Sequence, residues 1–106
     1  MRPFHDSILE PVIEAHDAAA RDAAIAEVIA HRAKAVIGRV LTPYWRSGFA
    51  LSPQDADDIA ASVSLRLLRK LRAVGEMAEE AIERFDDYVA TLTFNAAYDF
   101  FRRRVF

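Results

Sequence analysis

Residues 52–75 read SPQDADDIAASVSLRLLRKLRAVG, and this stretch decides the fold class. Ser52 can accept hydrogen bonds from the amides of a first helical turn, and Pro53 has no amide hydrogen to leave unsatisfied there. Asp55 suits the positive end of a helix. Apolar side chains then recur every three or four residues, at Ile59, Val63, Leu67, Leu71 and Val74, with Leu65 and Leu68 widening the stripe. The pattern predicts a long helix that ends at Gly75 and buries one face.

The same spacing predicts two more long helices and a shorter one at the N-terminus. The short helix covers about Ser7 to His16, and the first long one covers Asp22 to Leu41, where Thr42-Pro43 ends it. We expect a loop or a frayed helix end over residues 44–49 with a turn at Gly48. An acidic connector over residues 76–84, with at most a short helical turn, precedes a last helix from Phe85 to the arginines at 102–104. No strand is expected, so the fold class is all-α, a compact bundle of three long helices plus the shorter one.

Composition limits the kinds of protein this chain can be. Its 106 residues suit one core, and no repeat or linker divides them, so we expect a single domain over residues 1–106. The absence of cysteine excludes disulfides and thiolate sites. We find neither a signal peptide nor a membrane span in the sequence and expect a cytoplasmic location. A net charge of −2 means that any nucleic-acid site must be local, and basic residues do gather at 69–72 and 102–104.

The last helix carries more apolar surface than one core face needs. Phe85, Val89, Leu92, Ala96 and Phe100 form one face, and Ala90, Phe94, Ala97, Tyr98, Phe101 and Val105 form the opposite one. Tyr88, Thr91, Asn95, Asp99 and Arg102 form a polar strip between them. One explanation is a central helix buried on both sides. The other is a surface that stacks unpaired bases on aromatic rings, hydrogen-bonds a base through Asn95 and holds phosphates with arginines.

Two segments resemble a known family, the bacterial RNA polymerase sigma factors. Residues 55–69, with Asp55-Ala56-Asp57-Asp58-Ile59, Val63 and Leu65-Arg66-Leu67-Leu68-Arg69, are similar to the second conserved region of these proteins, especially the extracytoplasmic-function group. Residues 85–104 match the continuation of that region through Phe85, Tyr88, Val89, Leu92, Asn95, Ala97, Asp99 and the Arg102-Arg103-Arg104 run. The resemblance covers about residues 31–104, nearly all of the family's promoter-melting domain.

The resemblance implies a helical domain that binds core RNA polymerase and recognises and melts the minus-ten promoter element. The helix over residues 52–75 would dock on the clamp helices of the largest polymerase subunit through Asp55, Asp58, Ala61, Ser62 and Arg66. The last helix would hold the non-template single strand of promoter DNA through Tyr88, Phe94, Asn95, Tyr98, Arg102, Arg103 and Arg104. Bases would be captured beside Asn95 and in the loop before Phe85. An inhibitory anti-sigma factor is a further implied partner.

The chain departs from the family pattern at two places. The family's Gln-Glu pair, which helps to hold the clamp, is Ala61-Ser62 here, and the arginine expected before Asn95 is Phe94. The departures bear on polymerase docking more than on the fold. Without the resemblance, Asp55 and Asp58 are equally well explained as helix-start acids, and Arg66 as a solvated charge. A sigma factor would also continue beyond Arg104 to a second DNA-binding domain, so we expect an excised domain or a truncated relative.

Enzymatic chemistry is not indicated by the sequence. His5, His16 and His31 lack the spacing of metal ligands, no serine lies in a glycine-framed turn, and the three glycines are not grouped as in a phosphate loop. We therefore expect a chain that is not an enzyme and has neither a cofactor nor a metal. The main alternative to the sigma-like function is a helical interaction module without nucleic-acid binding, whose last helix packs on a partner or on a second copy.

Overall fold

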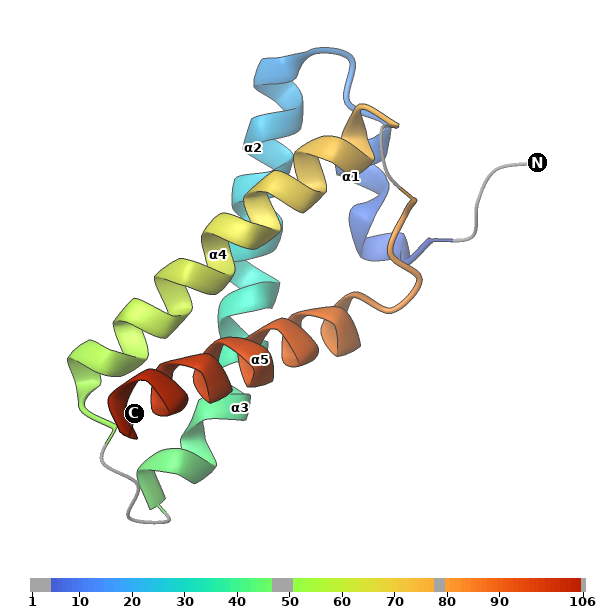
Figure 1. Ribbon diagram of the computed structural model, residues 1–106. Helices are drawn as coiled ribbons and strands as arrows, with labels where there is room; N and C mark the ends of the chain where they lie inside the picture. The colour runs from blue at the N-terminus through green and yellow to red at the C-terminus, as the bar shows by residue number, and fades with distance from the viewer. Residues whose placement is uncertain (1–4, 47–50, 78–79, 106) are drawn as a thin grey trace.

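Every element of the structure, a computed structural model that describes residues 5–46, 51–77 and 80–105, is helical (Figure 1). The elements follow in the order η1 (Ser7–Leu9), α1 (Glu10–Ile13), α2 (Ala18–Val28), η2 (Ile29–Ala33), α3 (Lys34–Arg46), α4 (Pro53–Gly75) and α5 (Phe85–Val105). The first, η1, is a 3-10 turn, and η2 is a π-helical turn that joins α2 and α3 into one continuous helical segment. The all-α prediction is confirmed for the described residues.

Helix α4 begins and ends where the sequence predicts. The Ser52 hydroxyl accepts a hydrogen bond from the Asp55 N–H at 3.1 Å, and the Asp55 carboxylate accepts one from the Ser52 N–H at 3.1 Å. This reciprocal pair satisfies two amides of the first turn. The five residues of the predicted stripe are all buried. Leu65 does not widen it, because its side chain is 49% exposed, whereas Leu68 is half-buried.

The first long helix is longer than predicted at both ends. It starts at Ala18 instead of Asp22, because the Asp17 carboxylate accepts a hydrogen bond from the Ala20 N–H at 2.7 Å. The short helix before it ends at Ile13 instead of His16.

The predicted stop at Thr42-Pro43 is wrong. Pro43 lies inside α3, and the residues from Tyr44 to Arg46, predicted as a loop or a frayed helix end, are helical. Pro43 removes the hydrogen bond to the carbonyl of Arg39 and crowds that carbonyl, and packing of the last turns outweighs this cost: Leu41 is buried, and the Tyr44 ring stacks on Phe101 at 5.3 Å. The predicted turn at Gly48 lies outside the described residues.

Helices α3 and α4 pack on α5 from two neighbouring sides. Figure 1 shows α5 converging with α4 toward the N-terminal end of α4, while α2 lies beside the C-terminal half of α4. Helix α2 approaches α4 closely at Gly75, where an added Cβ would collide with the Arg21 side chain. The short α1 packs against both α2 and α4. Among the described residues, no helix combines the length and apolar character that crossing a bilayer requires.

The first turn of α5 is held by residues from distant parts of the chain. Asp6 accepts a hydrogen bond from the Phe85 N–H at 3.0 Å and, through its other oxygen, one from the Ile8 N–H at 3.1 Å. The Asp6 N–H in turn donates to the carbonyl of Ile82 at 2.9 Å. Beside them, Arg32 of η2 forms a bidentate pair with Asp86, with both N–O distances at 2.8 Å. These contacts fix where α5 begins relative to η1 and η2.

The Asp6 carboxylate couples this arrangement to pH. Hydrogen bonds from the Phe85 and Ile8 amides, and more weakly the charge of Arg32, hold the pKa of Asp6 below its ordinary value of 3.8. The contribution of Asp6 to stability is therefore complete above that value and is lost as the pH falls through the lower folded pKa.

Replacing Asp6 with alanine is expected to lower the free energy of unfolding by about 1–2 kcal/mol at neutral pH, the usual cost of removing a helix-capping side chain. Urea unfolding of both chains across a pH series should give a difference that is constant above about pH 4 and shrinks below it. Asp57→Ala, at an exposed position of α4, is the control and should stay within about 0.5 kcal/mol of the native chain. A difference between the native and Asp6→Ala chains that stays constant into strong acid would contradict the assigned role of Asp6.

Candidate functional site

Helix α5 has one wide buried face instead of two opposite ones. Thr93 and Ala97 are fully buried together with Val89, because α3 and α4 cover adjoining sides of the helix. The prediction that Ala97 belongs to the outer apolar face is therefore wrong. The Thr93 hydroxyl donates to the carbonyl of Val89 at 2.8 Å, so its burial leaves no polar hydrogen unsatisfied. The rest of the helix circumference faces solvent.

The solvent-facing side of α5 carries an outer strip of five residues, and all of them except Thr91 belong to the predicted DNA-binding set. The outer strip consists of Tyr88, Thr91, Asn95, Tyr98 and Arg102. Tyr98 is 65% exposed, Asn95 and Arg102 are exposed, and Tyr88 is half-buried. At about 1.5 Å of rise per residue, the strip is roughly 21 Å long. It presents aromatic rings, an amide and a guanidinium group, of which the chain itself partly covers the Tyr88 ring.

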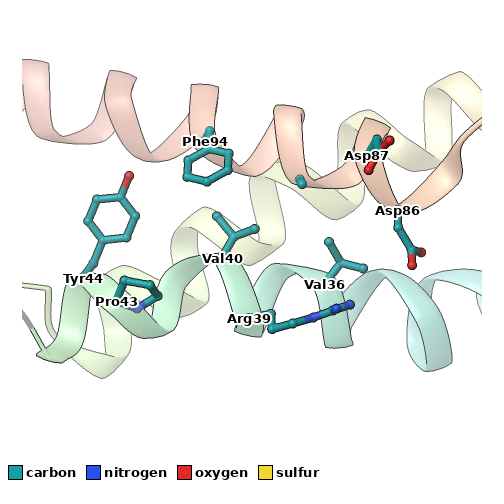
Figure 2. Close-up of a pocket in the computed structure, with 9 residues that line it drawn as sticks. Val36, Arg39, Val40, Pro43, Tyr44, Asp86, Asp87 and Phe94 are labelled. Carbon is teal, nitrogen blue, oxygen red and sulfur yellow. The ribbon is translucent and has the colours of Figure 1, made fainter.

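Phe94 lies at the edge of the outer strip, about 40° around the helix from Tyr98. It is 52% exposed and lines a groove of about 430 Å³ between α3 and α5, together with Val36, Val40 and Pro43. Figure 2 shows its ring pointing from α5 toward Val40. Consecutive residues of a helix are turned by about 100°, so Phe94 and Asn95 point in different directions. This groove is mostly apolar, with Asp86 and Asp87 at one end.

Tyr88 belongs to a second cavity, of about 400 Å³, where α4 meets the connector before α5. The ammonium group of Lys70 lies 6.0 Å from the centre of the Tyr88 ring, close to the limit for a cation–π contact. Lys70 and Arg84, which also lines this cavity, are additions to the set of expected site residues. Glu80, Glu83 and Asp87 line it too, so the cavity offers mixed charge. The connector residues over 80–84 that border it belong to the predicted loop before Phe85.

The residues expected to bind polymerase do not form a separate surface. Asp58, Ser62 and Arg66 line a cavity of about 190 Å³ between α4 and α5, which Arg103 and Asp99 line from the other side. Ala61 is exposed on α4, whereas the Asp55 carboxylate is occupied in the cap of that helix. The side chain of Arg104 lies outside the described residues. Arg103, expected at the DNA surface, therefore lies with three of the expected polymerase contacts.

Comparison of the chain with protein-family models, with curated proteins and with solved structures found no match. Within the described ranges, no group of three or more histidine, aspartate or glutamate side chains is placed to hold a metal ion. Any functional assignment therefore depends on the motifs in the sequence and on the placement of their side chains.

The exposure of the outer strip predicts an order of chemical modification among the three tyrosines. In protein dilute enough to be monomeric, tetranitromethane is expected to nitrate Tyr98 first, because Tyr88 and Tyr44 are half-buried. Peptide mapping by mass spectrometry after short exposures identifies the modified ring. The Tyr98→Phe variant should lose the fast phase of nitration and keep the slower modification of Tyr88 and Tyr44. Faster nitration of Tyr44 than of Tyr98 would mean that the outer strip is covered in solution.

Proposed function

We propose that this chain is a sigma-factor-like transcription initiation domain that binds core RNA polymerase and the non-template single strand of the minus-ten promoter element. The observation that carries the proposal is the exposure of Asn95, Tyr98 and Arg102 on one side of α5. Had α5 been buried on both sides, these groups would have been unavailable to any nucleic acid. Such a domain would act in the cytoplasm.

The outer strip supplies the three kinds of contact that an unpaired strand requires. The Tyr98 ring offers a face on which a base can stack, at a typical gain of about 1–3 kcal/mol per base. The Asn95 amide can both donate and accept, so it can discriminate between base edges. Arg102 is placed about one turn beyond Tyr98 to neutralise phosphate charge. A base that leaves the duplex loses its stacking energy and recovers it only on such a surface.

The cavity beside Tyr88 supports a second capture point near the start of α5. A base with its attached phosphate suits this cavity, because the cavity offers the Tyr88 ring, the ammonium group of Lys70 and the guanidinium group of Arg84. The acidic residues that line the same cavity repel phosphate, so a base of the strand would enter the cavity and its phosphate would stay outside. The cavity lies about 10 Å along the helix from Asn95.

The polymerase-binding part of the proposal is supported by the exposed charges of Asp58 and Arg66 on α4. Both line the small cavity that α4 shares with α5, next to Arg103. A partner helix that contacts α4 here would therefore lie next to the end of α5. This closeness gives a physical route by which polymerase binding can influence how α5 holds DNA.

Fluorescence anisotropy with single-stranded oligonucleotides of minus-ten-like sequence, over a salt series, tests the DNA part of the proposal. We expect weak binding that salt suppresses, because the chain's net charge is −2 and its basic site is local. Arg102→Ala should lower the affinity for every sequence and reduce the salt slope by about one phosphate contact. Asn95→Ala should instead change the base preference by about tenfold.

Arg69→Ala is the matched control, since Arg69 is exposed on α4 and is not part of the outer strip. It should leave the affinity for each oligonucleotide unchanged. Equal losses for Arg69→Ala and Arg102→Ala would indicate diffuse electrostatic attraction and would contradict a defined strip.

Capture of core polymerase by the immobilised chain tests the other surface. Asp58→Arg is expected to weaken capture by about tenfold, since reversing one charge of a matched pair is repulsive. The control is Asp57→Arg, which makes the same charge change at the neighbouring exposed position, turned by about 100° on the helix. If both variants bind core polymerase as well as the native chain, the polymerase surface does not lie at Asp58.

A further inference from the structure

Helix α5 carries a second regular pattern, of which its packing inside the chain uses chiefly Phe101, whose ring stacks on Tyr44. Residues separated alternately by four and three positions form a line along it, namely Asp87, Thr91, Phe94, Tyr98 and Phe101. This spacing is that of the a and d positions of a coiled-coil seam. We refer to these five residues as the α5 seam. Phe94 is 52% and Tyr98 is 65% exposed, so two large rings one turn apart lie largely in solvent.

The charges at the two ends of the α5 seam are opposite. Asp87 lies in the first turn of α5 with a side chain that is 71% exposed and 3.5 Å from the guanidinium group of Arg84. Arg102 lies about one turn beyond Tyr98, beside the other end of the seam, and is exposed. The point midway between these two residues falls between Phe94 and Asn95, at the centre of the seam. A two-fold axis at this point would place Asp87 of each copy opposite Arg102 of the other.

We propose that the chain forms a symmetric dimer in which the α5 helices of two copies pack antiparallel along their seams. The Phe94 and Tyr98 rings of both copies form the centre of the interface. The two Asp87–Arg102 pairs fix the register at its ends. The antiparallel direction also places the positive N-terminal end of each helix dipole next to the negative C-terminal end of the other. A partner of different sequence would need to reproduce both charges and both apolar positions, whereas a second copy supplies them by symmetry.

The groove between α3 and α5 enlarges the apolar area available to the second copy. Val40 and Pro43 of α3 lie beside Phe94, as Figure 2 shows, so a helix placed on the seam contacts α3 as well. The contact remains modest in area compared with obligate dimers, and we expect a dissociation constant on the order of micromolar.

The dimer would cover Tyr98 and Arg102, which also belong to the outer strip proposed to bind DNA. Dimer formation and single-strand binding should therefore compete. The dimer itself does not depend on the proposed function, because its test uses the protein alone and involves no nucleic acid or polymerase.

Sedimentation equilibrium over a range of protein concentrations, with paired charge reversals, tests the dimer. Asp87→Arg and Arg102→Asp should each raise the dissociation constant at least tenfold, because each places like charges together at both ends of the interface. An equimolar mixture of the two variants should restore dimers, since each copy then supplies the charge that the other requires. This recovery would also show that both variants fold, because misfolded chains would not complement each other.

The controls make equal charge changes elsewhere, with Asp57→Arg and Arg69→Asp at exposed positions of α4. Both should dimerise like the native chain. A native chain that remains monomeric up to about 1 mM would overturn the proposal. So would a dimer that neither reversal weakens, or a mixture that stays monomeric, since these results place the contact on another face.

Discussion

The carboxylate of Asp6 sets the position of α5, and the features from which function is inferred lie on or beside that helix. One oxygen accepts from the first amide of α5 and the other accepts from η1, two elements that are far apart in the sequence. The neighbouring Arg32–Asp86 pair adds a contact to η2. With its first turn fixed in this way, α5 can pack on α3 and α4 along one side and leave the other side to solvent. Displacement of that turn would move the whole outer strip.

The sequence predicts well those features that depend on near neighbours. The start of α4 is correct because Ser52 and Asp55 cap each other three residues apart, and its stripe is correct because it follows the helical repeat. The stop at Pro43 is wrong because the packing of Leu41 and Tyr44 depends on distant helices. The same limit applies to Ala97, since a helical wheel gives the direction of a residue but not the width of the face that two neighbouring helices cover.

The composition of the candidate site was predictable in part, and its grouping was not. Exposed Asn95, Tyr98 and Arg102 agree with the expected surface, whereas Phe94 faces the groove toward α3. Lys70 and Arg103 meet residues of the other long helix because α4 and α5 cross antiparallel, and no local spacing encodes that crossing. Arg103, expected to contact DNA, therefore lines one cavity with residues of α4 that were expected to contact polymerase.

The π-helical turn at Ile29–Ala33 has a consequence for the long segment that contains it. In a regular helix, Val36 and Ile37 would be rotated by roughly 100° from the line of Ile25 and Val28. A π turn rotates the chain by a smaller angle per residue than an α-helix does. Over its length it therefore offsets a rotation of about this size. The four side chains are thus brought into phase, and all four are buried. The hydrophobic face of this segment is continuous because the π turn contains one residue more than an α-helix with the same number of turns.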